Sequence, residues 1–486
     1  MLFWRRFSLL LVFLTAVFIL SYDLWYFILQ EAKGATWYEV LLKDGIIIDG
    51  TGKEPYQGDL LIRGSKIIAV GKDLNPGPGT RVVDVQGNFI LPGFIELHPG
   101  LLPTGAEQEK WIRAGVTTII GGDAGFSPIE LKGYLESLSQ QPPCFNYGML
   151  FGLGSLRAVL EKDSQQPREG ALEKAGEIVK NALAGGALGL SLDLDSFPGG
   201  LWEWDDLQKL LYTISRETDG KNLLVVGFPE EIVFREDAFQ HILCQVLRQP
   251  SGSSLAFHLR NFRLRRGASS VAVAAIKKCM QEARAEGVRV SGDLNPFGFT
   301  GGPCYPLAEA AERFSGEDLI FAKVPEDLRE IAGKSVAEVA RCRGVAVPAL
   351  VDQLRKRNIQ VEVVETGAEQ EFSELPFFCW QAVYTGGERG VDPDEEPRPY
   401  FSIFEDRPIL GITKLEKKVE KLTALPAEIF GLEKRGVIKP GYYADLLVVR
   451  LQSNDSDYCL EHVLVNGRFV LKNGRFTGIS AGRLCY

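Results

Sequence analysis

One segment of the sequence resembles the start of a metal site but holds one histidine, His98, where two would be expected. Residues 91–97 form a mostly apolar run typical of a short buried strand, and His98 follows directly. At the carboxyl end of a barrel strand, such a side chain would point into an active site. Side chains two residues apart share a face of a strand, but the position two residues after His98 is Gly100. A catalytic zinc ion needs about three protein ligands, so this segment predicts an incomplete metal site.

The composition is that of a large globular protein with a moderate negative charge. The 486 residues include 54 basic and 63 acidic side chains, which gives a formal net charge of −9. This length suits one large barrel or about two to three domains. The sequence has no basic blocks of the kind that bind phosphates, so nucleic acid is not expected as a partner. Its 8 cysteines lack CxxC spacing, and we interpret them, like His241 and His462, as structural.

The first 35 residues differ from the rest of the chain. Arg5 and Arg6 precede an apolar run at residues 7–22, and a second apolar patch extends to residue 29. Together the two runs exceed the roughly 20 residues that cross a bilayer. We expect residues 1–35 to be an uncleaved membrane anchor, and the alternative is a cleaved signal peptide that would give a secreted protein. Because the arginines precede the run, the positive-inside rule places the remaining chain outside the cytoplasm.

Short strand-like runs separated by turn signals occupy both ends of the remaining chain. Residues 36–90 hold several such runs, and residues 437–486 resume the same pattern. Asn466-Gly467 between two apolar runs is a strong signal for a two-residue hairpin. Neither end is large enough to bury a core alone, so we expect both ends to form one small β-sandwich.

The central residues, 91–436, alternate strand-like runs with amphipathic helical stretches. The alternation predicts an α/β fold, specifically a distorted TIM-like (β/α)8 barrel. A stretch at about 298–373 breaks the rhythm, and we expect it to be an insertion over the barrel mouth. The expected strands lie at residues 115–120, 188–192, 223–226, 255–258 and 288–291, and the clearest helices lie at 171–184 and 271–286.

Several motifs resemble one family across almost the whole chain after residue 36. They include residues 91–98, Gly125-Phe126-Ser127, the glycine-rich run at 185–191 and the C-terminal run at 435–446. In these motifs the chain resembles the D-aminoacylase or N-acyl-D-amino-acid deacylase branch of the amidohydrolase superfamily. The resemblance implies a barrel that hydrolyses the amide of an N-acylated D-amino acid. It also implies zinc to activate water and an aspartate as proton shuttle.

The metal and proton-transfer positions of that family are only partly matched. The resemblance places His98 and His258 at two metal-ligand positions. Gly100 stands at the place of a second histidine, Ala124 at that of a zinc-binding cysteine, and Gly386 at that of the catalytic aspartate. Without these groups, little remains to bind a divalent ion or to lower the pKa of a bound water. We therefore assign no catalytic residue.

Some substrate-facing positions persist. Arg398 and Tyr400 lie in a segment that resembles the family stretch whose arginine binds the substrate carboxylate, a task that suits a planar guanidinium. Arg260 stands at a position that is usually basic in the family. A surface salt bridge is the alternative for either arginine. The resemblance thus indicates a small carboxylate-bearing molecule as ligand, while the sequence leaves the oligomeric state open.

Two functions remain open on the sequence. The first is a membrane-anchored, metal-poor pseudoenzyme of the D-aminoacylase type that is catalytically impaired and binds an N-acyl amino acid or a similar carboxylate, or serves as a scaffold. The second is an active hydrolase of amide carbon-nitrogen bonds with a rearranged one-metal site at His98 and His258. Asp123, Glu230 or Asp293 would then supply further ligands. Zinc is expected only for the active hydrolase, with no cofactor otherwise.

Overall fold

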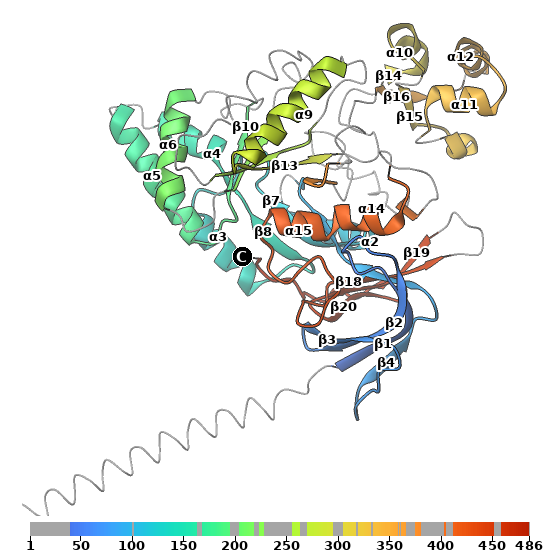
Figure 1. The fold of residues 1–486 in the computed structure, drawn as a ribbon, viewed down its shortest axis with the longest axis horizontal. Coiled ribbons are helices and arrows are strands. Elements are labelled where there is room, and N and C mark those ends of the chain that lie inside the picture. Colours follow the sequence, from blue (N-terminus) through green and yellow to red (C-terminus); the bar gives the residue numbers. More distant parts are fainter. Residues whose placement is uncertain are drawn as a thin grey trace, which may run out of the picture.

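The computed structural model describes most of the chain after residue 38. The described residues are 39–99, 102–162, 168–194, 204–217, 223–227, 255–262, 270–294, 305–316, 319–331, 334–357, 359, 361–365, 375–380, 403–404, 412–451 and 458–485. They form a β-sheet built from both ends of the described chain, a central set of parallel strands flanked by helices, and a small peripheral α/β unit (Figure 1).

Strands from both ends of the chain share one 9-stranded sheet. Its strands are β1 (Glu39–Ile47), β2 (Tyr56–Arg63), β3 (Lys66–Gly71), β4 (Arg81–Asp84), β5 (Phe89–Pro92), β18 (Leu446–Leu451), β19 (Tyr458–Val465), β20 (Arg468–Lys472) and β21 (Arg475–Phe476). The two ends meet where β5 pairs antiparallel with β18, with Leu446 opposite Pro92. The order is β21-β20-β19-β18-β5-β1-β2-β3, and β4 pairs with β1.

This sheet curls so that its two ends share one apolar core. Ile62 and Ile67 at one end of the strand order pack in the same cluster as Leu464 and Phe469 at the other end. Alternate residues of a strand face the same side, so each end supplies only one apolar face and needs the other to cover it. The strands are continuous in a single sheet. The domain boundaries expected from the sequence stay predictions.

The central strands are all parallel to their neighbours. They are β6 (Phe94–Glu96), β7 (Val116–Gly121), β8 (Asn146–Met149), β9 (Phe151–Gly152), β10 (Leu190–Asp193), β11 (Leu223–Gly227), β12 (Ala256–Leu259), β13 (Arg289–Leu294) and β17 (Phe378–Trp380). They form a 3-stranded sheet, β6-β7-β8, and a 6-stranded sheet, β17-β13-β12-β11-β10-β9. Only Leu150 separates β8 from β9, so the two sheets follow one another as one wall. Pairing of β6 with β17, which would close a barrel, is not found among the described residues.

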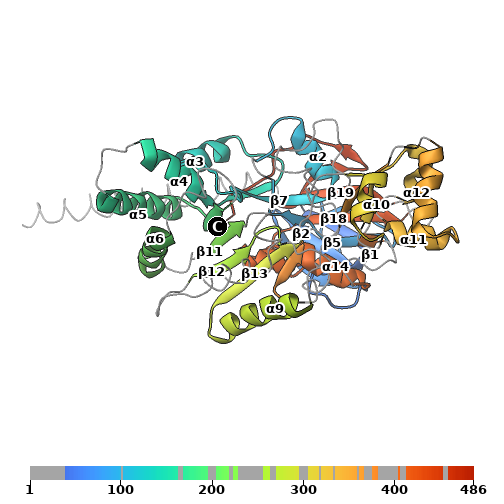
Figure 2. The same ribbon diagram turned by 90° about the horizontal axis from the view of Figure 1, so that it is seen from above.

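Helices cover the outer side of this wall (Figure 2). They are α2 (Glu107–Arg113), α3 (Leu131–Gln140), α4 (Leu153–Lys162), α5 (Arg168–Ala184), α6 (Trp204–Glu217), α9 (Ser270–Ala285), α14 (Leu415–Leu422) and α15 (Ala424–Ile429). The strands expected near residues 115, 188, 223, 255 and 288 and the helices expected at 171–184 and 271–286 are confirmed. Every residue of β7, β10, β11 and β12 is buried, so these strands read as mostly apolar runs, which is why the sequence showed them clearly.

A small α/β unit interrupts the chain between β13 and β17. It holds β14 (Tyr305–Pro306), α10 (Leu307–Arg313), β15 (Leu319–Lys323), the 3-10 helix η2 (Glu326–Ile331), α11 (Val336–Cys342), α12 (Val347–Lys356) and β16 (Glu362–Glu365). Residues such as Phe321, Leu350 and Val363 give it a core of its own. The unit lies at the side of the molecule in Figure 1. That it covers a barrel mouth stays a prediction.

The predicted membrane anchor is not upheld. No helix within the described part of the chain is long and apolar enough to cross a membrane. Residues 1–35, where the anchor or signal peptide was expected, lie outside the described residues. We therefore correct the prediction: a single-pass N-terminal anchor with the barrel outside the cytoplasm is not supported.

Asn466 connects the C-terminal hairpin to two other segments. The hairpin that Asn466-Gly467 predicted is confirmed, with β19 and β20 on either side. Asn466 has a φ of 47°, and its side-chain amide donates to Asn146 Oδ1 at 2.7 Å and to the Ala481 carbonyl at 2.8 Å. This one residue thus holds β8 and the C-terminal segment against the hairpin.

Asn466→Ala is expected to destabilise the protein by about 2 kcal/mol or more, because it strains a left-handed residue and leaves buried partners unsatisfied. Asn473→Ala is the matched control. Asn473 also precedes a glycine and has a φ of 49°, but its side chain is exposed. We expect the control to cost about 1 kcal/mol from backbone strain alone. Urea unfolding of both variants measures the difference, and equal losses would show that the side-chain contacts of Asn466 contribute nothing.

Candidate functional site

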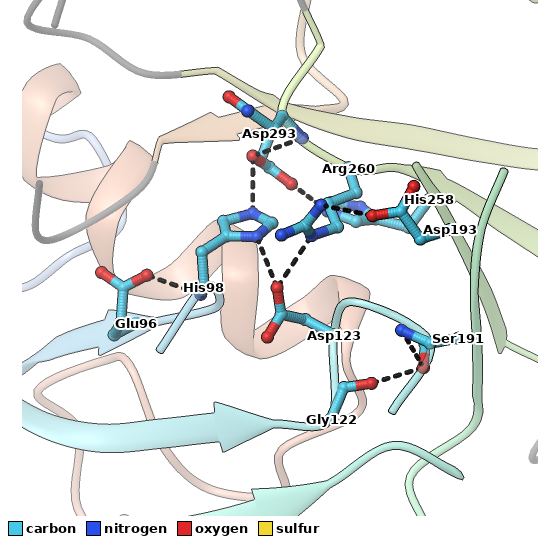
Figure 3. Close-up of polar contacts among 11 residues, drawn as sticks. Glu96, His98, Gly122, Asp123, Ser191, Asp193, His258, Arg260 and Asp293 are labelled. Carbon is cyan, nitrogen blue, oxygen red and sulfur yellow. Dashed lines mark hydrogen bonds and ion pairs between the residues drawn. The ribbon is translucent and has the colours of Figure 1, made fainter. Parts of the chain in front are cut away.

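The two histidines singled out in the sequence come together at the carboxyl ends of the central strands. His98 follows β6, and His258 lies on β12. Both contact the carboxylate of Asp293 on β13: His98 Nε2 lies 2.8 Å from Oδ1, and His258 Nε2 lies 2.8 Å from Oδ2 (Figure 3). Asp293 therefore lies between the two imidazole rings and joins β6, β12 and β13.

The pairing of β12 with β13 explains this arrangement. His258 lies opposite Ser291 in the register of the two strands, and Asp293, two residues further along, faces the same side. His258 Nδ1 lies 3.0 Å from Ser291 Oγ, and that hydroxyl donates to the Phe257 carbonyl at 3.2 Å. Both ring nitrogens of His258 thus face oxygen atoms of the protein.

The other side of His98 meets a second aspartate. His98 Nδ1 lies 3.1 Å from Asp123 Oδ2, and the His98 backbone N–H donates to Glu96 Oε1 at 2.6 Å. All three side chains are buried. Both nitrogens of the His98 ring therefore contact carboxylates.

Asp123 lies in a tight loop after β7 that only glycine permits. Gly122 has a φ of 80°, and a Cβ at that position would collide with the Leu150 carbonyl. Ser191 Oγ donates to the Gly122 carbonyl and accepts from the Gly125 backbone N–H at 3.2 Å. This network, drawn in Figure 3, directs the Asp123 carboxylate towards His98.

Arg260 completes the cluster from the end of β12. Its Nε donates to Asp123 Oδ2 at 2.8 Å, and its Nη1 donates to Asp193 Oδ2 at 3.3 Å. The arginine side chain is 18% exposed, whereas the two carboxylates are 1% and 5% exposed. A guanidinium thus lies between two buried carboxylates that come from different strand ends.

The charges of the cluster reinforce one another. Burial acts to lower the pKa of His98, but the carboxylates of Asp293 and Asp123 outweigh it and raise that pKa to about 10. Burial acts to raise the pKa of Asp123, but Arg260 and His98 hold it below its usual range. His98 and His258 likewise hold the pKa of Asp293 well below its usual range against the effect of burial. Ionised aspartates and cationic partners therefore stabilise each other.

This arrangement does not fit a zinc site. Zinc binds a neutral imidazole through a ring lone pair, but both nitrogens of His98 and of His258 contact protein oxygens. Ala124 provides no thiolate. Across the part of the chain that the structure describes, no group of three or more His, Cys, Asp or Glu side chains is arranged to hold a metal ion.

Several predicted positions lie outside the described residues. They are Gly100, Glu230, His241, Gly386, Arg398 and Tyr400. Among the described ones, His462 is buried beside Phe469 and accepts from the Asn473 backbone N–H, in keeping with a structural role. Asp193 was missed in the sequence. Its position at the end of a buried strand was a usable signal, because charged residues at such ends face the site.

Comparison with known proteins agrees with this fold. The Amidohydrolase family model matches residues 412–470. The chain is 27% identical to the N-acyl-D-glutamate deacylase of Alcaligenes xylosoxydans xylosoxydans, over 88% of this chain and 93% of that protein. It is 25% identical to the D-aminoacylase of the same organism, over 92% and 97% of the two chains. The chain is thus similar to N-acyl-D-glutamate deacylase and D-aminoacylase over most of its length, and its residues 412–470 match the Amidohydrolase family.

Solved structures of such enzymes share the fold. The N-acyl-D-glutamate deacylase of Bordetella bronchiseptica, solved with zinc and a phosphonate inhibitor, gives a TM-score of 0.65 at 23% identity, over 92% of this chain and 98% of that one. A D-aminoacylase structure gives 0.64 at 23% identity, over 92% and 99% of the two chains. The predicted α/β fold of the TIM-barrel type is confirmed at this level. Identity this low supports the fold and carries no activity to this chain.

Asp293→Asn should destabilise the protein by about 3 kcal/mol or more, because it removes the buried anion between His98 and His258. Asp206→Asn is the control: Asp206 is also buried, but it pairs with an exposed lysine, Lys209, at 3.9 Å. Such a pair contributes up to about 1 kcal/mol. The midpoint of urea unfolding reports both changes. A smaller loss for Asp293→Asn than for Asp206→Asn would contradict the linking role of Asp293.

Proposed function

We propose that this protein is a metal-poor, catalytically impaired D-aminoacylase-like homologue that binds an N-acyl amino acid or a similar small carboxylate. One observation carries the proposal. His98 and His258, which the resemblance places at metal-ligand positions, contact Asp293 on both sides instead of facing an open position. A catalytic metal site keeps such a position open for water.

The remaining side chains offer little for hydrolysis of an amide. Attack of water on an amide requires a group that takes its proton and a cation that stabilises the developing oxyanion. Both oxygens of Asp293 face imidazole nitrogens, and Arg260 is held by Asp123 and Asp193. Asp123 Oδ1 is buried without a hydrogen-bond partner, but the contacts of Asp293 and Arg260 support a stable site more than a reactive one.

The ligand class comes from the relatives and from the sequence. Two relatives are named N-acyl-D-glutamate deacylase and N-acyl-D-aspartate deacylase, and both names describe N-acylated amino acids. We propose that Arg398 binds the carboxylate of such a ligand, with Tyr400 beside it, since a guanidinium suits bidentate pairing. Arg260 is engaged by protein carboxylates in the structure, so its proposed role towards the ligand is secondary.

An active hydrolase with one metal ion is the second candidate. It is favoured by the convergence of His98, His258, Asp123 and Asp293 on one place. Related structures are described with zinc and with a binuclear metal centre. Zinc would then be required. The side chains that bind it would first have to break their present contacts with one another.

The metal content of the purified protein separates the two candidates. We expect well under one equivalent of zinc by elemental analysis, and no release of amino acid from N-acetyl-D-glutamate with or without added zinc, because no described group offers an open metal position. His258→Ala should then change stability alone, by up to a few kcal/mol. Stoichiometric zinc together with amide hydrolysis that is lost in His258→Ala would establish the active hydrolase instead.

Arg398→Ala tests the ligand. If Arg398 binds a carboxylate, the variant should weaken the affinity for N-acetyl-D-glutamate by about 1.5 to 3 kcal/mol, or roughly 10-fold to 150-fold, through loss of a charge-assisted pair. Isothermal titration calorimetry measures this affinity. Arg113→Ala is the control, because Arg113 on α2 is half exposed and pairs with Glu109. An unchanged affinity in Arg398→Ala would exclude this arginine from the ligand site.

A further inference from the structure

We propose that a group of cationic side chains around Tyr443 binds a phosphate-type dianion, such as inorganic phosphate, sulfate or a phosphate monoester. With the tyrosine, which we include in the name Tyr443 cluster, the group consists of Lys66, Lys434, Arg435 and Arg483. The cluster lies beside the sheet built from both ends of the described chain and shares no residue with the candidate functional site. The inference therefore goes beyond the proposed function.

Three of the cations lie against the ring of Tyr443. Lys66 Nζ is 2.9 Å from the ring centroid, the guanidinium carbon of Arg435 is 4.1 Å from it, and that of Arg483 is 6.0 Å from it. The face of an aromatic ring is negative and attracts cations. The tyrosine therefore gathers like charges that would otherwise repel one another.

Contacts between distant segments hold the cluster in place. Lys66 and Tyr443 form an antiparallel bridge, and the Tyr443 backbone N–H donates to the Lys434 carbonyl at 2.9 Å. Arg483 Nη1 donates to Ser65 Oγ at 3.4 Å. Because the cations come from three separate parts of the chain, the sequence shows no basic block at any of them.

The cluster carries more positive charge than the protein offsets. Burial, together with Arg435 and the other nearby cations, lowers the pKa of Lys66 to about 8. Among the described carboxylates, Asp445 alone opposes this effect. Asp445 is already bound by Arg435 and by the Asn466 backbone N–H, the latter at 2.8 Å. Like charges this close disfavour one another, so an anion from solution would relieve the repulsion.

The exposed side of the cluster gives such an anion access. Lys434 and Arg483 are exposed and Lys66 is partly exposed, whereas Arg435 is buried beneath them. A guanidinium forms paired hydrogen bonds with the oxygens of a phosphate, and an ammonium group adds a point charge. A dianion offsets more of the excess charge than a single carboxylate does. The formal net charge of the whole chain is −9, so the attraction must be local to this cluster.

Isothermal titration calorimetry of the full-length protein with sodium phosphate, at constant ionic strength, tests the site. We expect saturable binding that sulfate competes for and acetate does not. Lys66→Met and Arg483→Met should each weaken phosphate binding by about 10-fold, because each removes a charge-assisted contact. Equal affinity for glycerol 3-phosphate would support a monoester as ligand, and binding of inorganic phosphate alone would support the free anion. No saturable binding of either would overturn the inference.

Lys43→Met and Arg450→Met are the matched controls. Their side chains are 46% and 51% exposed on the same sheet, but each pairs with a carboxylate: Lys43 with Asp44 at 3.7 Å and Arg450 with Glu461 at 3.0 Å. Neither change should alter the affinity for phosphate. Weakening in these controls equal to that in Lys66→Met and Arg483→Met would show non-specific attraction and overturn the inference.

Acetylation of the parent protein covers failure of a variant to fold. Sulfate should slow the reaction of Lys66 with acetic anhydride roughly 5-fold or more, compared with sodium chloride at the same ionic strength, because a bound anion shields the amine and favours its protonated form. Lys43 in the same sample should react at the same rate in both salts. Peptide mass spectrometry measures both lysines. An unchanged rate at Lys66, or equal slowing at Lys43, would contradict the site.

Discussion

The burial of Asp293 between two imidazole rings is the constraint on which the candidate site depends. A buried carboxylate is tolerated only when its charge and its lone pairs are matched. His98 and His258 provide that match at 2.8 Å each, and His98 is itself held by Asp123, which depends on Arg260. Since each member is stabilised by the next, the cluster behaves as one unit, and the loss of any member leaves a buried charge.

The same constraint connects the site to the sheet built from the two ends of the chain. β5 of that sheet runs into β6 of the central wall with only Gly93 between them, and the Gly93 backbone N–H donates to the Asp445 carbonyl at 3.0 Å. Any side chain at Gly93 would collide with Thr117. The position of His98 therefore depends on β18, which begins next to Asp445, more than 300 residues away in the sequence. The composite sheet is part of what orients the site.

Local patterns predicted the elements, and the family resemblance implied the meeting of the two histidines, but neither predicted the pairing of their neighbours. Apolar runs gave β7 and β10 to β13, and Asn466-Gly467 gave the hairpin, because such signals arise from residues close in the chain. The contacts of Arg260 with Asp123 and Asp193 span 137 and 67 residues. They depend on which strand ends are neighbours in space. The sequence identified Arg260 only by resemblance, as a group that faces a ligand, whereas the structure pairs it with the protein.

The cluster also separates two requirements that strand ends of this kind place on their side chains. What the strand ends require is neutralisation of buried carboxylates, and any well-placed cation meets that requirement. What hydrolysis requires in addition is an electrophile with an open position and a base for the attacking water. Arg260 and His98 meet the first requirement in this chain. Because the two requirements are separable, charge balance at buried residues such as Asp123 and Asp193 stabilises the strand ends without itself supplying the groups that hydrolysis needs.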